Sequence, residues 1–336
     1  MQNRKLILLL ILVLNATLLS CNSSEETKAD NNKAYTHPQV INYTQAIELT
    51  PEDASLYFKR SIALSHLNQD QLALKDLDKA ISLDPKNDTY YIGKGELLYI
   101  LERYNESVLA YKHAFEINPE KIQIQLAIAK SLLMDNKTDQ SQQIINKILK
   151  DNPYYPDAFY IQAQVYASQK DTTKAITELK KALKIDPFYY EASLLLAEYW
   201  AELKNNNAFP QYLYTYSLDS SDIYPLFQIG YLYEQIQDTV SAKKSYYSII
   251  MLDKDYTDAY IRMGKILVAQ DSIEKAQRNF ALAVATEPNN SQAHYLLGNT
   301  YEQLNKLDSA KLYYANALGI EPNFKEAKEA FKKLKK

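Results

Sequence analysis

The residue types that carry most protein chemistry are few in this 336-residue sequence, and they stand far apart. Cys21 is the only cysteine, which excludes a disulfide framework and a metal site with several thiolate ligands. The four histidines (His37, His66, His113 and His294) are too widely spaced for a zinc-binding pair on one helix. No Gly-x-Ser-x-Gly nucleophile motif occurs. The sequence therefore predicts a protein that is not an enzyme and that holds no metal ion or cofactor.

The composition is that of an ordinary folded protein with balanced charge. Hydrophobic residues make up 46% of the chain and charged residues 24%, which argues against global disorder. The 38 basic and 41 acidic residues leave a net charge of −3, so no electrostatic footprint for nucleic acid is visible. A single core stops growing near ~250–300 residues. We therefore expect either two domains or an elongated repeat array.

Residues 1–20 have the pattern of a secretory signal peptide. Arg4 and Lys5 precede the apolar run from Leu6 to Leu14. In a helix this run would rise about 14 Å, roughly half of the ~30 Å hydrocarbon core of a bilayer. A cleaved signal peptide is therefore favoured over the alternative of a single spanning helix.

The end of this segment, Leu18-Leu19-Ser20-Cys21, resembles the lipobox of bacterial lipoproteins. The resemblance implies cleavage before Cys21 and acylation of its sulfur, since two or more lipid chains anchor a protein stably. Asn22 is not the aspartate that retains lipoproteins at the inner membrane in well-studied Gram-negative bacteria, so the resemblance favours the outer membrane, on either its periplasmic or its surface face. Residues 21–35 are polar and are expected to form a flexible tether.

Proline spacing reveals an internal repeat. Seven of the eleven prolines lie on one 34-residue lattice with a single one-residue deletion: Pro51, Pro85, Pro119, Pro153, Pro187, Pro288 and Pro322. Counted from Ala54, the eighth residue of every unit is small: Ser61, Gly95, Ala129, Ala163, Ala197, Gly230, Gly264 and Gly298. The twenty-fourth is large: Leu77, Tyr111, Ile145, Leu179, Leu213, Tyr246, Phe280 and Tyr314. Because apolar residues recur three or four places apart, each unit is predicted to be two amphipathic helices that cross closely.

A 34-residue helix–turn–helix unit with this alternation of small and large residues resembles the tetratricopeptide repeat. The resemblance implies an all-α, right-handed superhelical solenoid with eight units at 54–87, 88–121, 122–155, 156–189, 190–222, 223–256, 257–290 and 291–324. Residues 36–53 are expected to form an N-terminal half repeat. Residues 325–336 are expected to form a C-terminal capping helix, because a solenoid must cover its last apolar face.

The unit 190–222 is degenerate, because it contains the missing residue. The lattice puts Phe209, Leu213 and Tyr216 at its twentieth, twenty-fourth and twenty-seventh places, where the first and last are too bulky for the pattern. The run Asn205-Asn206-Asn207 predicts a longer turn and a delayed second helix. A functional bend and a locally repacked repeat are both open interpretations.

The resemblance also implies that the first helix of each unit lines a concave groove suited to an extended peptide or a helix. The candidate binding residues on this face are Tyr160, Gln164, Phe227, Tyr231, Arg262, Lys265, Tyr295 and Asn299. Chaperone-binding members of the family clamp a carboxylate with a lysine at the fifth place and an asparagine at the ninth. No unit here has lysine at the fifth place, so no such chaperone partner is expected.

Four Asp-Ser/Thr-apolar tripeptides fall in the predicted turns between the helices of a unit, and they resemble an O-glycosylation motif of one group of Gram-negative bacteria. The acceptor hydroxyls would be those of Thr172, Thr239, Ser272 and Ser309. The alternative is helix capping, for which Asp, Ser and Thr are preferred.

The predicted function is that of a lipid-anchored scaffold of the bacterial envelope, which binds envelope proteins or extended peptides in its groove. Capture of surface glycans is the alternative, and a purely structural spacer is a third interpretation.

Overall fold

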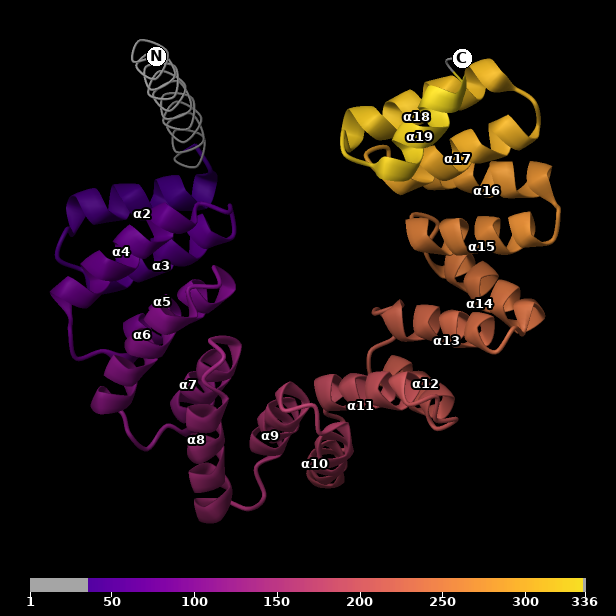
Figure 1. Cartoon of the computed structure of the whole chain (residues 1–336). Coiled ribbons are helices and arrows are strands. Elements are labelled where there is room, and N and C mark those ends of the chain that lie inside the picture. Colours follow the sequence, from indigo (N-terminus) through magenta and orange to yellow (C-terminus); the bar gives the residue numbers. More distant parts are fainter. Residues whose placement is uncertain (1–35, 335–336) are drawn as a thin grey trace, which may run out of the picture. The chain divides into compact units, whose positions relative to one another are not determined.

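The computed structural model describes residues 36–334, and every regular element in that range is an α-helix (Figure 1). Eight helix pairs follow one another: α3 (Ala54–Ser65) and α4 (Asp70–Leu83), α5 (Asp88–Ile100) and α6 (Tyr104–Ile117), α7 (Ile122–Met134) and α8 (Thr138–Asp151), α9 (Pro156–Ser168) and α10 (Thr172–Ile185), α11 (Tyr190–Glu202) and α12 (Ala208–Leu218), α13 (Tyr224–Gln235) and α14 (Thr239–Leu252), α15 (Thr257–Ala269) and α16 (Ile273–Thr286), α17 (Ser291–Gln303) and α18 (Leu307–Ile320). The architecture is an all-α solenoid, as predicted. The predicted signal peptide, Cys21 and the predicted tether lie outside the described residues.

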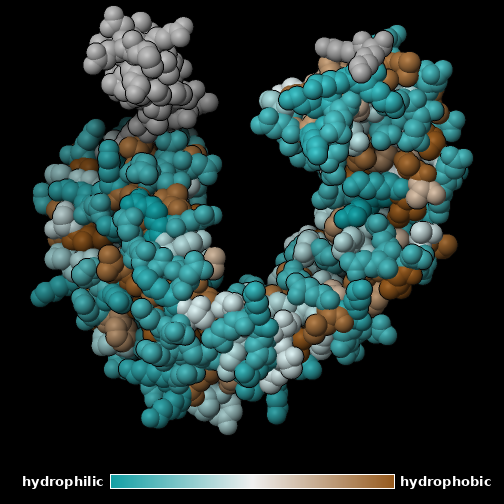
Figure 2. Space-filling view, in the orientation of Figure 1, coloured by the Kyte–Doolittle hydropathy of each residue, from teal (hydrophilic) through white to brown (hydrophobic). Residues whose placement is uncertain are grey.

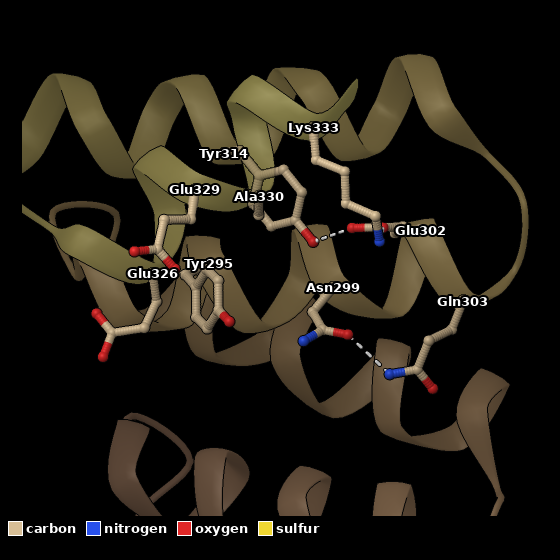
Figure 3. A pocket seen from close by; sticks show the side chains of 9 residues that line it. All are labelled: Tyr295, Asn299, Glu302, Gln303, Tyr314, Glu326, Glu329, Ala330 and Lys333. Atoms are coloured by element: carbon tan, nitrogen blue, oxygen red, sulfur yellow. Dashed lines mark hydrogen bonds and ion pairs between the residues drawn. The ribbon is translucent and has the colours of Figure 1, made fainter. Parts of the chain in front are cut away.

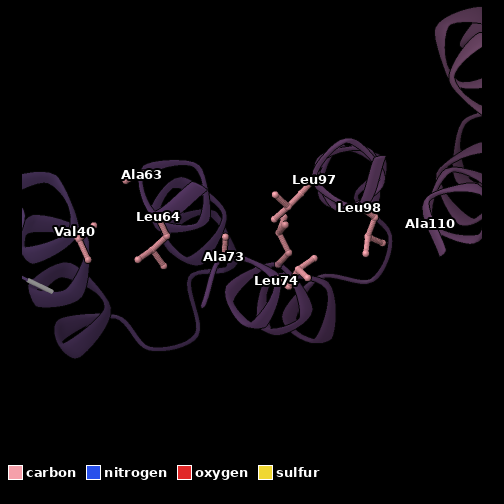
Figure 4. Close-up of a cluster of buried hydrophobic side chains, with 9 residues drawn as sticks. Val40, Ala63, Leu64, Ala73, Leu74, Leu97, Leu98 and Ala110 are labelled. Atoms are coloured by element: carbon pink, nitrogen blue, oxygen red, sulfur yellow. The ribbon is translucent and has the colours of Figure 1, made fainter. Parts of the chain in front are cut away.

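The chain divides into two compact units, between Glu178 and Leu179 within α10. In each unit, helices that are neighbours in sequence pack against one another. The core is accordingly a row of small clusters instead of one large one. In unit 1, for example, Val40 of α2 (Pro38–Leu49), Leu64 of α3 and Leu98 of α5 belong to one cluster that passes from pair to pair (Figure 4).

Close crossing of the two helices in a pair depends on the small residue at the eighth place. A Cβ added to Gly95 would lie 2.8 Å from the ring of Tyr111, and one added to Gly264 would lie 2.5 Å from the ring of Phe280. Gly230 and Gly298 face Tyr246 and Tyr314 in the same way. These aromatic rings therefore occupy the space that a side chain on the first helix would need. The predicted close crossing is confirmed.

Every turn inside a helix pair contains one residue with a left-handed backbone. These residues are Asn68, Glu102, Asn136, Lys170, Lys204, Gln237, Asp271 and Asn305, with φ between 52° and 63°. The amide of the residue that follows donates to a carbonyl five residues earlier, as from Arg103 to Leu98 at 2.9 Å, which ends the first helix in a Schellman motif. Glycine is common at this position in other proteins, but this chain places its glycines inside helices.

The degenerate unit keeps the packing pattern one residue earlier than the sequence lattice predicts. Leu213 is 54% exposed, whereas Tyr212 is 1% exposed and packs with Ala197 in the core. Ala208 and Thr215, not Phe209 and Tyr216, take the two buried small positions of α12. The predicted placement of Phe209, Leu213 and Tyr216 is therefore wrong, because the missing residue lies before α12 and shifts that whole helix.

The predicted longer turn and delayed second helix of this unit are confirmed. Five residues, 203–207, separate α11 from α12, whereas three separate α13 from α14. As a result α12 lacks its first turn, and exposed asparagines stand where that turn would begin.

The two end helices cover the outermost pairs. Ala327 of α19 (Lys325–Leu334) is fully buried against the last pair, and Val40 of α2 is fully buried against the first. Among the helices of the described range, none combines the length and apolar character that a membrane crossing requires.

Because the Gly264 site is filled by Phe280, we expect Gly264→Ala to destabilise the protein by about 1–3 kcal/mol through overpacking. Gly319 of α18 is the control, since nothing lies within 4 Å of an added Cβ there. Gly319→Ala should stabilise the protein by about 0.5–1 kcal/mol through lower backbone entropy of the unfolded chain. Urea unfolding followed by circular dichroism measures both, and equal effects of the two substitutions would contradict the packing argument.

Candidate functional site

The predicted groove residues are all half-buried, and they are divided between the two compact units. Tyr160 and Gln164 lie on α9 in unit 1. The other six lie on three successive first helices of unit 2, with two each on α13, α15 and α17. Side chains that are neither buried nor fully exposed on a run of parallel first helices suit contact with a partner, although binding at these residues stays a prediction.

Tyr231 and Arg262 are the predicted site residues that contact one another. The guanidinium carbon of Arg262 lies 4.6 Å from the centre of the Tyr231 ring, within range of a cation–π interaction. The same guanidinium is 3.7 Å from Oε2 of Glu234, whose other oxygen, Oε1, accepts a hydrogen bond of 2.5 Å from the Tyr246 hydroxyl. Burial and this bond to Glu234 raise the pKa of Tyr246 well above its usual value. The network therefore links the exposed face of α13 and α15 to the aromatic ring that packs on Gly230.

Lys265 lies on α15 beside this network and is half-buried. Burial, together with the neighbouring charge of Arg262, lowers the pKa of its amine. Two adjacent cations on one helix thus face the carboxylate of Glu234.

Phe227 and Tyr295 each pack against an aromatic ring further along the chain, and their role as binding residues stays a prediction. The ring of Phe227 lies 5.5 Å from that of Tyr256, and the ring of Tyr295 lies 5.2 Å from that of Phe324. Each ring therefore contributes to the junction between one helix pair and the next element.

A hollow of about 580 Å³ lies between α17 and the end helix α19 (Figure 3). Glu302 stands on one side, where it accepts hydrogen bonds from the Tyr314 hydroxyl at 2.8 Å and from the Lys333 amine at 3.0 Å. Burial alone would raise the pKa of Glu302, but these two bonds lower it below its usual value. The Gln303 amide donates to Asn299 at 2.7 Å, so Asn299 points into this hollow with one partner already in place.

A second hollow, which we call the tyrosine hollow, has a volume of about 520 Å³ and lies between α11 and α13. Its walls include four tyrosines and two carboxylates: Tyr199, Tyr212, Tyr224, Tyr231, Glu198 and Glu202. The Tyr224 hydroxyl donates to Glu198 at 3.3 Å. Burial nevertheless raises the pKa of Glu198 above its usual value, and the neighbouring charge of Glu202 adds to that effect.

A third hollow of about 370 Å³ continues the tyrosine hollow over the edge of the helix stack, and we call it the edge notch. The two share Ala201, Lys204, Leu232 and Gln235. The remaining walls of the edge notch are Asn205 and Asn206 of the long turn, Phe209 of α12 and Ile236 after α13. Both hollows lie in unit 2 and border the degenerate repeat.

These two hollows were not selected from the sequence. Glu198 occupies the ninth place of its unit, which is a groove-facing place, and that signal was available. The edge notch exists because α12 begins late, at Ala208. Neither the side-chain types nor the proline lattice indicates that the missing first turn of α12 leaves an open space.

The four predicted hydroxyl acceptors are all half-buried. Next to Thr239 and Thr172, the preceding aspartate caps the start of the helix. Asp238 accepts a hydrogen bond from the Ser241 amide at 3.0 Å, and Asp171 accepts one from the Lys174 amide at 3.0 Å. Thr172 and Thr239 are the first residues of α10 and α14, and Ser309 lies in the first turn of α18, so their predicted position in a turn between helices is wrong. Ser272 does lie in such a turn, next to the start of α16. O-glycosylation of Thr172, Thr239, Ser272 and Ser309 stays a prediction.

Within residues 36–334 no group of three or more His, Cys, Asp or Glu side chains is arranged to hold a metal ion. The visible surface of each unit is mostly hydrophilic, with apolar side chains in small groups (Figure 2). Such a surface suits contacts with other proteins through particular side chains more than burial of one broad apolar face.

Two family models of the tetratricopeptide repeat match this sequence. One matches residues 54–87, 88–121 and 291–324, and the other matches residues 126–190. The chain contains tetratricopeptide repeats. The predicted resemblance is thereby confirmed for the repeats, whereas the lipobox lies outside what these matches cover.

Curated relatives match only part of the repeat region. The small glutamine-rich tetratricopeptide repeat-containing protein 2 of Mycosarcoma maydis is 31% identical over 112 residues, which are 32% of this chain and 32% of the relative. The Hsp70-Hsp90 organizing protein of Triticum aestivum is 26% identical over 121 residues, 35% of this chain and 21% of the relative. The chain thus spans about a third or less of the length of these relatives. Their similarity does not support the predicted exclusion of a chaperone partner, which stays a prediction from the fifth-place residues.

Two solved structures align with this chain, and the first of them agrees in fold. The Pseudomonas aeruginosa pilF structure aligns with a TM-score of 0.50 and 18% identity, covering 63% of this chain and 96% of that one. The Cut9–Hcn1 hetero-tetramer of the APC/C aligns with a TM-score of 0.48 and 18% identity, covering 88% of this chain and 58% of that one.

Because burial penalises the ionised form of Glu198, Glu198→Gln is expected to stabilise the protein at pH 7. Because the pKa of Glu198 is raised in the folded protein, ionisation of its carboxyl as the pH rises lowers the free energy of unfolding of the wild-type protein. The gain from the substitution should therefore be largest at pH 7 and shrink as the pH falls towards 4. Urea midpoints at several pH values measure it, with Glu191→Gln on the exposed side of α11 as the control. A gain that grows on acidification would contradict this assignment.

Proposed function

We propose that the protein is a non-catalytic scaffold that binds a segment of another protein on the first-helix face of its repeats. The observation that carries this proposal is the tyrosine hollow, where aromatic rings and two carboxylates line an open space between successive first helices. Tyrosines that present a ring edge and a hydroxyl are common anchors at protein interfaces. The repeats themselves support a binding role, since a stack of helix pairs offers an extended surface.

We also propose that the scaffold is anchored in the outer membrane of a bacterial envelope by lipid on Cys21. The support is the sequence alone: a charged start, a short apolar run and a lipobox-like segment that ends in the only thiol. Envelope proteins or extended peptides would then be the partners.

A photo-crosslinking amino acid placed at Tyr231 tests the binding face. We expect crosslinks from Tyr231 to a defined segment of one partner in the native cell, because Tyr231 lines the tyrosine hollow. The matched control is Tyr247 on α14, which is 59% exposed on a second helix. The proposal fails if Tyr247 gives the same crosslinks as Tyr231, or if Tyr231 gives none. Saturable binding of an oligosaccharide, with no protein crosslink, would favour the glycan alternative.

Cys21→Ser tests the anchor. The substitution removes the sulfur that the lipid would occupy, so we expect the protein to leave the membrane fraction and to lose incorporated radiolabelled palmitate. Fractionation and labelling in the native host measure both. Retention of label and of membrane association by the Cys21→Ser variant would rule out acylation at this residue.

A further inference from the structure

We propose that the tyrosine hollow and the edge notch together form a two-part binding site for an extended peptide. The tyrosine hollow takes an arginine side chain of the partner, and the edge notch takes a large apolar side chain a few residues further along. This inference rests on the proposed function and names the chemistry of the partner segment.

The next junction along the chain, between α13 and α15, contains an internal contact of the same kind. Between α13 and α15, Tyr231 at the ninth place and Glu234 at the twelfth hold the guanidinium of Arg262, which stands at the sixth place of the following unit. The protein thus fills this junction with an arginine of its own, placed against a tyrosine ring and a carboxylate.

The junction between α11 and α13 has alanine (Ala201) at the twelfth place, but it offers carboxylates at two neighbouring places and lacks an arginine at the sixth place. Glu198 stands at the ninth place and Glu202 one turn further on, while Gln228 replaces the arginine. Gln228 carries no charge, so Lys204 is the one cation among the lining residues of the hollow, against two carboxylates. The space that Arg262 fills in the next junction is here part of an open hollow of about 520 Å³. A guanidinium from outside fits both the charge and the tyrosine walls.

The edge notch is open because a contact found at other junctions is missing there. At three of the regular junctions, a side chain from the first turn of the second helix bonds to the end of the next first helix or the turn after it. Thr138 bonds Ser168 at 3.4 Å, Thr239 accepts from Gln270 at 3.4 Å, and Asn105 accepts from Lys137. These bonds close the edge between neighbouring repeats.

The degenerate repeat has no such turn, because α12 begins only at Ala208. Phe209 and Ile236 therefore border an open notch, and Ile236 is 63% exposed. An apolar side chain that enters here would cover Ile236 and the edge of the Phe209 ring, which already packs 4.9 Å from Tyr233. Since the notch and the tyrosine hollow share Ala201, Lys204, Leu232 and Gln235, one peptide segment spans both.

Fluorescence anisotropy with short labelled peptides tests the site on the full chain in mild detergent. The peptides carry one arginine and one leucine, separated by one, two or three residues, in a glycine–serine background. Matching peptides replace arginine with citrulline, which keeps the shape but removes the charge, or leucine with serine. We expect saturable binding of at least one spacing, about tenfold weaker binding with citrulline, and a smaller loss with serine.

Protein variants locate the site. Glu198→Gln should weaken the arginine peptide about tenfold, whereas Glu96→Gln, the same exchange at the ninth place of α5, should leave it unchanged. Gln228→Arg should also block the peptide, because it supplies the missing guanidinium from within. Ile236→Ser should weaken only peptides that contain leucine, and Ile100→Ser at a site that is 70% exposed is its control. Circular dichroism verifies that each variant is folded.

The inference is overturned if no peptide binds saturably, if citrulline and arginine peptides bind equally, or if Glu96→Gln causes the same loss as Glu198→Gln. Its failure is separable from that of the proposed function. Capture of a partner at Tyr231 that Glu198→Gln does not affect would overturn this site and leave the scaffold function standing.

Discussion

The close crossing of two helices within each repeat is the constraint on which the rest of the structure depends. A second helix that carries Tyr246 or Phe280 approaches its partner only because glycine stands opposite the ring. This approach fixes which face of the first helix turns outward, and so determines which side chains can meet a partner. The same contact links fold to surface directly, since Tyr246 packs on Gly230 and donates to Glu234 beside Arg262.

Most of the fold was predictable because this packing rule is local and repeats every 34 residues. The eighth-place residues predicted from the lattice are all buried or fill close contacts in the structure. The rule failed only in the degenerate repeat, where the position of the missing residue had to be chosen. The proline lattice by itself does not show that it lies before α12, so Phe209 was expected in the place that Ala208 takes.

The candidate site was harder to predict because it depends on what the repeats leave open. Tyr231 was selected from its place in the unit, and the structure brings it against Arg262, another predicted site residue. Phe227 and Tyr295 were selected by the same rule but pack against neighbouring rings, a distinction that requires knowledge of the adjoining helix. The edge notch results from a missing helical turn, which becomes a space only in three dimensions. The departure from the repeat pattern, more than the pattern itself, therefore supplies the features that distinguish one surface of this protein from another.

A double-mutant cycle between Gly264 and Phe280 tests the central constraint most directly. Phe280→Leu alone should destabilise the protein, as loss of a buried ring does. If the two positions share one space, Phe280→Leu should restore much of the free energy of unfolding that Gly264→Ala removes. Ala129 and Ile145 form an equivalent pair of a small and an aliphatic residue in unit 1. The account predicts a favourable coupling of about 1–2 kcal/mol from urea unfolding. Strict additivity of the two substitutions would contradict it.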